Sequence, residues 1–169
     1  MESGEQAKDA ASIARGYFDA VAAQDVEAMI GFWEPGAHDV IHGIVDMRVP
    51  EDMRTWFGNL FAAFPDYRFE VIDVMANGEK AAVHWRATGT FNGSARFEGL
   101  LANGSRVEVQ GCDVVTVRDG LISRNDAYVN AAEMARQLGA LPPVGSLPER
   151  ALTGMLNGKT RLAARLKSN

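Results

Sequence analysis

The sequence has little of what several protein classes need. Its 169 residues contain one cysteine, Cys112, so the chain cannot form an internal disulfide or a thiolate metal site. No apolar run approaches the roughly 20 residues of a membrane-spanning helix, and the first residues are polar and acidic, unlike a signal peptide. We therefore expect a cytoplasmic protein with no membrane partner.

Basic side chains are also in the minority. The chain has 17 Lys and Arg against 22 Asp and Glu, and no basic cluster is long enough to follow a phosphate backbone, so nucleic acid is not an expected partner. An apolar fraction of 47% with 23% charged residues is typical of a globular protein. The length predicts one domain with a short appendage.

The motifs of several large enzyme classes are absent as well. HExxH, GxSxG, Walker and GxGxxG sequences do not occur, and the three histidines, His38, His42 and His84, lack metal-ligand spacing. The expected site therefore uses no metal and no cofactor.

What the sequence does contain is a change of hydrophobic period at Pro65. Before it, apolar spacings of three and four predict helices over residues 7–23, 25–33 and 50–65, and Pro35-Gly36 ends the second. After it, four turn dipeptides separate β-prone runs: Asn77-Gly78, Asn92-Gly93, Asn103-Gly104 and Asp119-Gly120. This order predicts an α+β domain in which three helices pack on a five-stranded antiparallel meander.

One acidic residue stands out in the stretch of residues 106–118. Alternation gives this strand a polar face and an apolar face, and Asp113 is the only charge on the apolar one. A carboxylate there must be paired, hydrogen-bonded or protonated, so we expect its pKa to be raised. A structural Asp that accepts hydrogen bonds and a functional carboxyl both fit this position.

The next strand, residues 121–130, has two mixed faces. One face carries Ile122, Arg124, Asp126, Tyr128 and Asn130, and the other carries Leu121, Ser123, Asn125, Ala127 and Val129. If the first set points inward, Asp126, Tyr128 and Asn130 join Asp113 around a pocket. Periodicity alone leaves both orientations open.

Short segments along the chain follow the order and spacing of a known family. They are Tyr17, Ala23-Gln24-Asp25-Val26, Trp33, Phe64-Pro65-Asp66, Trp85 before Gly89-Thr90, Phe97-Glu98-Gly99, Asp119-Gly120-Leu121-Ile122 and Gln137-Leu138-Gly139. From about Ala10 to Gly139 the chain resembles the SnoaL-like polyketide cyclases of the NTF2-like superfamily. The resemblance implies a cone, in which three helices wrap a curved antiparallel sheet around a deep apolar pit for a hydrophobic small molecule.

The resemblance also implies roles for individual residues. Cyclases of this family use an aspartate seven residues before the Gln of Gln-Leu-Gly as the acid/base group, and that position here is Asn130, which cannot exchange a proton near neutral pH. The related ketosteroid isomerases have a helix tyrosine and a strand aspartate similar to Tyr17 and Asp113, which would donate hydrogen bonds to an enolate oxygen. Their base would fall near Ile41 and His42, which makes His42 the candidate base.

A third relative suggests another chemistry. Limonene-type epoxide hydrolases use an Asp-Arg-Asp relay, and Asp113, Arg124 and Asp126 supply the residue types, although a surface Arg–Asp pair explains the last two equally well. The large aromatic residues either belong to the core or contact the substrate. They are Trp33, Trp56, Phe61 and Trp85.

The sequence thus predicts an acid/base enzyme without a cofactor. Its expected catalytic residues are Tyr17, His42, Asp113 and Asp126, and the expected reaction is cyclisation, isomerisation or epoxide opening of a polyketide- or terpenoid-type molecule. The alternative is a non-catalytic binding or assembly module that kept the pit after losing the base. Asn130 favours this alternative.

The C-terminal segment is expected to be a separate tail. A Leu-Pro-Pro link after Gly139 divides a domain of residues 1–141 from a helical tail of residues 142–169. The tail has an apolar stripe without a partner: Leu152, Met155, Leu156, Leu162 and Leu166. We expect a homodimer in which the tail packs across the neighbouring subunit or across its own pit mouth.

Overall fold

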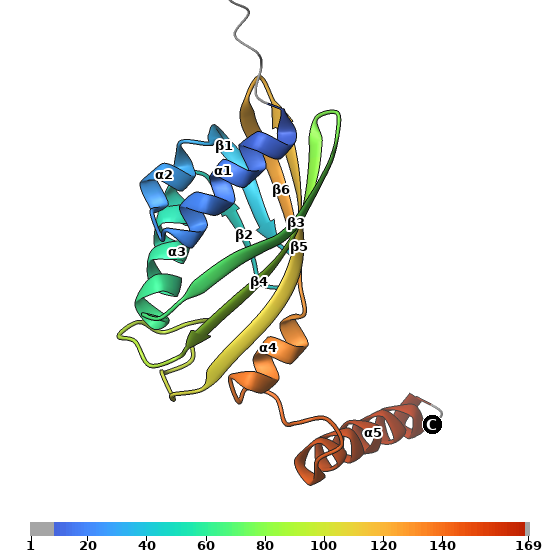
Figure 1. The fold of residues 1–169 in the computed structure, drawn as a ribbon. Helices are drawn as coiled ribbons and strands as arrows, with labels where there is room; N and C mark the ends of the chain where they lie inside the picture. Colours follow the sequence, from blue (N-terminus) through green and yellow to red (C-terminus); the bar gives the residue numbers. More distant parts are fainter. Residues whose placement is uncertain (1–8, 168–169) are drawn as a thin grey trace, which may run out of the picture.

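A curved, open sheet of six strands forms the centre of the structure, a computed structural model that describes residues 9–167 (Figure 1). The strands lie in the order β2-β1-β6-β5-β4-β3, and every neighbouring pair is antiparallel except β1 and β6. Their bounds are Trp33–Ile41 (β1), Val45–Arg48 (β2), Arg68–Asn77 (β3), Lys80–Thr90 (β4), Arg106–Arg118 (β5) and Leu121–Val129 (β6).

Three N-terminal helices cover the concave side of this sheet, as the sequence predicts. They are α1 (Ala10–Ala22), α2 (Val26–Ile30) and α3 (Glu51–Ala63). The side chains of Asp9 and Asp25 accept hydrogen bonds from backbone N–H groups in the first turns of α1 and α2, which fixes where these helices begin. The predicted α+β class and the NTF2-like cone are confirmed.

The predicted five-stranded meander is wrong in its details. Strands β1 and β2 lie between α2 and α3, so only four strands follow Pro65. Pro35-Gly36 lies inside β1 rather than at the end of a helix, and Gly36 adopts a φ of +82°, where glycine is favoured. The β1–β6 register shifts between Trp33 and His38, so the irregular dipeptide is absorbed as a bulge.

Two of the four predicted turns are not hairpins. Asn92-Gly93 and Asn103-Gly104 belong to one long loop between β4 and β5, in which the pairing among the described residues is a single bridge from Phe97 to Leu100. The other two dipeptides do form tight turns: Asn77-Gly78 joins β3 to β4, and Asp119-Gly120 joins β5 to β6.

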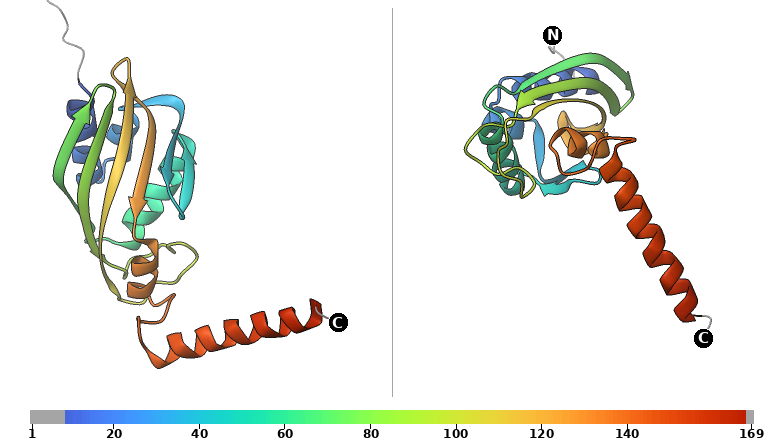
Figure 2. Two further views of the ribbon diagram at one scale, coloured as in Figure 1. Left: turned by 90° about the vertical axis from the view of Figure 1, so that its right-hand side faces the viewer. Right: turned by 90° about the horizontal axis from the view of Figure 1, so that it is seen from below.

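Two further helices follow the sheet. The short helix α4 (Ala131–Gln137) lies at one end of the cone, and α5 (Leu147–Lys167) projects away from it (Figure 2). The apolar stripe of α5 is exposed, from Leu152 to Leu166. Among the described residues, no helix is both long enough and apolar enough to span a membrane.

Candidate active site

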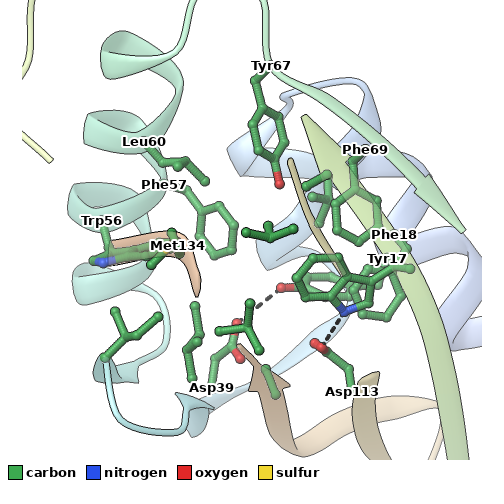
Figure 3. A pocket seen from close by; sticks show the side chains of 18 of the residues that line it. Tyr17, Phe18, Asp39, Trp56, Phe57, Leu60, Tyr67, Phe69, Asp113 and Met134 are labelled. Carbon is green, nitrogen blue, oxygen red and sulfur yellow. Dashed lines mark hydrogen bonds between the residues drawn. The ribbon is translucent and has the colours of Figure 1, made fainter. Parts of the chain in front are cut away.

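An apolar pocket of about 100 Å³ lies between the concave face of the sheet and helices α1 and α3 (Figure 3). Met134 of α4 and Ile44 of the β1–β2 turn also line it. Eight of its nineteen lining residues are aromatic: Tyr17, Phe18, Trp56, Phe57, Tyr67, Phe69, Trp85 and Phe97. Its carboxyl and phenol groups are those of Tyr17 on α1, Asp39 on β1, Asp113 on β5 and Tyr67, which precedes β3.

Asp113 points into the pocket, as strand alternation predicts. It is 4% exposed, and its two carboxylate oxygens accept hydrogen bonds from Trp85 Nε1 at 2.6 Å and from Asn125 Nδ2 at 2.6 Å. Gly111 stands opposite Trp85 in the β4–β5 register, and a Cβ at this position would collide with the indole ring. The glycine therefore leaves room for the indole that binds Asp113.

A second buried carboxyl, Asp39, faces the same pocket. It is 2% exposed and accepts hydrogen bonds from Tyr17 Oη at 3.1 Å and from Asn125 Nδ2 at 2.9 Å. The dashed line between Tyr17 and Asp39 in Figure 3 shows the first of these bonds. The sequence predicts His42 as the candidate base near Ile41, but the group that faces the pocket there is Asp39, two residues from Ile41 on the same face of β1.

Asn125 joins the two carboxyl groups. Its Nδ2 donates to one oxygen of Asp39 and to one oxygen of Asp113, while its own Oδ1 is buried without a hydrogen-bond partner. Five side chains from α1, β1, β4, β5 and β6 thus form one network. They are Tyr17, Asp39, Trp85, Asp113 and Asn125.

Burial sets the protonation of this network. It raises the pKa of Asp39 to about 7, with a further contribution from the charge of Asp113 and a partial offset by the hydrogen bonds from Asn125 and Tyr17. Burial also raises the pKa of Asp113 to about 6, against two hydrogen bonds that favour its ionised form. The two coupled carboxyls therefore exchange protons near neutral pH.

Tyr17 keeps its proton throughout this range. Burial raises the pKa of its hydroxyl well above the usual value, and the nearby carboxylates raise it further. The phenol is therefore a hydrogen-bond donor at any pH at which the protein works.

Comparisons with known proteins identify the family of the chain. The SnoaL-like domain family matches residues 14–125, which is more than half of the chain. The chain belongs to the SnoaL-like family. No curated protein matches it at a significant level.

Solved structures share the fold of this SnoaL-like protein. A proposed SnoaL-like polyketide cyclase from Jannaschia sp. CCS1 is 21% identical, with a TM-score of 0.71 over 84% of this chain and 99% of that one. AclR, a proposed hydroxylase from Streptomyces galilaeus, is 23% identical, with a TM-score of 0.69 over 94% of both chains. An epoxide hydrolase of the limonene type from M. tuberculosis is 15% identical, with a TM-score of 0.59 over 78% of this chain and 90% of that one.

Strand β6 of this SnoaL-like protein settles the orientation that periodicity leaves open. Asn125, Ala127 and Val129 face the pocket side, and Asp126 and Tyr128 face outward. Asp113 pairs with Ala127 in the register, and Asp126 pairs with Val114, so the two aspartates point to opposite sides of the sheet. Of the two orientations that periodicity leaves open, the structure has the one in which Asp126 and Tyr128 point away from the pocket.

His42 and Arg124 belong to the outer side as well. His42 Nε2 lies 2.8 Å from Asp126 Oδ1, its ring stacks on Tyr128, and Arg124 donates two hydrogen bonds to Asp126. The Asp-Arg-Asp relay does not form, because Asp113 lies across the sheet from Arg124 and Asp126. The surface Arg–Asp pair is the arrangement that the structure has.

Some of the remaining predicted site residues line the pocket and others lie outside it. Trp56 and Trp85 line the pocket, whereas Trp33 lies in the core against Tyr17, and Phe61 packs on Phe57 outside the pocket lining. Asn130 is exposed and caps α4 by accepting a hydrogen bond from the Glu133 N–H.

The described part of the chain has no cluster of side chains that could bind a metal ion. No group of three or more His, Cys, Asp or Glu side chains within residues 9–167 is arranged to hold a metal ion. The pocket carboxyls instead meet amide, indole and phenol donors.

Proposed function

We propose that this SnoaL-like protein is an acid/base enzyme that moves a proton on a hydrophobic, polyketide- or terpenoid-type ketone, as in isomerisation or ring closure. The observation that carries the proposal is Asp39, a buried carboxyl held by Tyr17 and Asn125 at the inner end of an apolar pocket. A general base works best when its pKa lies near the working pH, and burial beside Asp113 raises the pKa of Asp39 to about 7.

The reaction begins with a proton on the carbon next to the substrate carbonyl. The ionised Asp39 takes this proton, so the C–H electron pair becomes an enolate and Asp39 becomes a carboxylic acid. Once Asp39 is a carboxylic acid, the Tyr17 O–H turns from Asp39 to the developing enolate oxygen and donates a hydrogen bond to it, because its pKa is raised too far for it to ionise itself.

The second half of the reaction returns the proton. In an isomerisation Asp39 protonates a different carbon of the same molecule, and in a ring closure the enolate carbon attacks a second carbonyl, whose oxygen receives the proton. Asp113 remains ionised, and its charge helps to keep Asp39 basic. The related cyclase and hydrolase structures support this class of small-molecule chemistry.

Hydrogen exchange with solvent tests the first step without knowledge of the natural substrate. The protein is incubated in D₂O with a panel of hydrophobic cyclic ketones, and NMR follows the loss of the C–H signal next to the carbonyl. We expect Asp39→Asn to lower the enzyme-dependent exchange rate by about 10²-fold or more, which is the usual contribution of a general base.

A matched control distinguishes the loss of the base from the loss of any one negative charge. Asp19, an exposed carboxylate on α1, is changed to Asn in the same way and is expected to keep the wild-type rate. Circular dichroism confirms that both variants are folded. Exchange that is equally fast in Asp39→Asn and in the wild type would refute Asp39 as the base.

A further inference from the structure

The pocket is unusual in the sign of its charges. It contains two carboxyl groups, Asp39 and Asp113, and among the described residues that line it there is no Lys, Arg or His. The described ion pairs of the chain involve other residues, none of which lines this pocket. A buried carboxylate without a cation is costly, so this lining favours a ligand that brings a positive charge.

The hydrogen-bonding groups also favour such a ligand, because the network has more free acceptor positions than free donors. The donors of the network, Tyr17 Oη, Trp85 Nε1 and Asn125 Nδ2, already donate to the two carboxyl groups. Each carboxylate oxygen accepts a single hydrogen bond there and has a further lone pair, and the Tyr67 hydroxyl, which also lines the pocket, can accept a hydrogen bond as well. The group that best completes this set is one that only donates.

The wall suits an organic cation better than a metal ion. Its rings include Tyr17, Phe18, Phe69 and Trp85 around the carboxyl groups, and Trp56 and Phe57 on the α3 side (Figure 3). The faces of aromatic rings attract alkylammonium groups, with Trp the strongest, while the apolar remainder of the ligand fills the pocket. A small aromatic or alicyclic amine combines these properties in about the volume available.

We propose that this pocket binds hydrophobic amines in their protonated form, with the ammonium group on the pocket side of Asp39 and Asp113. The proposal concerns the same pocket as the proposed function but does not depend on its chemistry. An amine would occupy the place of the reacting ketone and would therefore act as a competitive inhibitor of proton exchange.

Three probes of nearly equal shape test the preference for charge. Benzylamine, benzyl alcohol and benzoate are titrated into the protein at pH 7.5 by calorimetry, in 0.5 M NaCl so that weak attraction to the acidic surface is screened. We expect benzylamine to bind at least tenfold more tightly than benzyl alcohol, and benzoate to bind most weakly. Equal or weaker binding of the amine would overturn the proposal.

Variants then assign the preference to the pocket. Asp113→Asn is expected to reduce benzylamine affinity at least tenfold and to leave benzyl alcohol affinity within about twofold, whereas Asp19→Asn changes neither. Asp39→Asn provides the same comparison if Asp113→Asn does not fold. An amine preference that survives in both pocket variants would show that the amine binds elsewhere.

The two proposals fail independently. If the wild-type protein binds benzylamine but does not accelerate hydrogen exchange of the ketones, the proton-transfer function alone is refuted. Exchange that is insensitive to saturating benzylamine would refute the amine site alone.

Discussion

At the scale of single residues, the two pocket carboxyls should make the protein less stable as the pH rises. Their pKa values are raised by burial, to about 7 for Asp39 and about 6 for Asp113, from a usual value of 3.8. Between about pH 4 and pH 7 the folded state therefore holds more protons than the unfolded state. The free energy of unfolding falls as the pH rises through this window and levels off above it.

Replacement of Asp39 by Asn removes part of this dependence. We expect the free energy of unfolding of Asp39→Asn to vary less between pH 5 and pH 8 than that of the wild type, with a difference on the order of a few kcal/mol. Urea unfolding at both pH values measures it, and Asp19→Asn is the control. Parallel pH profiles for the wild type and Asp39→Asn would contradict the raised pKa.

Asn125 should matter because it is the shared donor. Asn125→Leu keeps the branched shape of the side chain but leaves one oxygen of Asp39 and one of Asp113 without a hydrogen bond, at a cost of about 1–3 kcal/mol for each buried group. We expect the loss of stability to be larger at pH 8 than at pH 5, because protonation relieves the buried charge. A loss that is independent of pH would mean that Asn125 only fills space.

The sequence predicts Asp113 but not Asp39, although one rule covers both. Asp113 stands in a long, regular strand, where alternation leaves a single charge on the apolar face. Asp39 follows Pro35-Gly36, which indicates a chain reversal, and the register shift of β1 hides the alternation of Ala37, Asp39 and Ile41. Alternation does not show which face of β6 points to the pocket, and so does not place Asn125, because both faces mix polar and apolar residues.

At the scale of secondary-structure elements, the sheet order depends on a contact that local patterns do not encode. Hairpins β3–β4 and β5–β6 are marked by their turn dipeptides, and the sequence predicts them. The parallel pairing of β1 with β6 joins Val40 to Asp126, residues far apart in the chain, and no turn residue specifies it. This pairing brings Asp39 beside Asn125 and so completes the network.

Helix α4 provides a prediction at the same scale. Asn130 accepts a hydrogen bond from the Glu133 N–H, so Asn130→Ala should cost about 1 kcal/mol of stability, while Asn130→Asp retains the cap. Thermal unfolding measures both variants. Because Asn130 is exposed and does not line the pocket, neither variant should change the rate of ketone exchange by more than about twofold. A large increase of this rate in Asn130→Asp would instead support the acid/base role that the family resemblance implies for this position.

At the scale of the whole molecule, charge is divided unequally between the cone and its tail. Residues 147–169 contain five basic side chains and one acidic one, whereas the preceding 146 residues contain 12 basic and 21 acidic ones. The basic helix α5 projects from an acidic body and leaves its apolar stripe exposed, with Leu162 60% and Leu166 73% accessible. Opposite charge on the cone of a second copy would attract the tail.

The outer face of the sheet offers a second surface for the same association. Cys112 and Val114 of β5 lie on it between the polar Gln110 and Thr116, and Tyr128 of β6 is 53% exposed. Together with the stripe of α5, this surface favours a homodimer in which each tail packs on its neighbour. Burial of apolar area at about 25 cal/mol per Å² would provide several kcal/mol for such an association.

Light scattering at micromolar concentration tests the dimer. We expect a particle of about twice the 18.3 kDa chain mass, and a shift toward the monomer when the chain is cut after Pro143 or when Leu156 in the stripe is changed to Gln. Asn157→Gln, on the opposite face of α5, is the control and should leave the mass unchanged. A monomer for the full chain would refute the dimer, and a dimer that survives the cut would assign the association to the sheet face, since the tail would then contribute nothing to it.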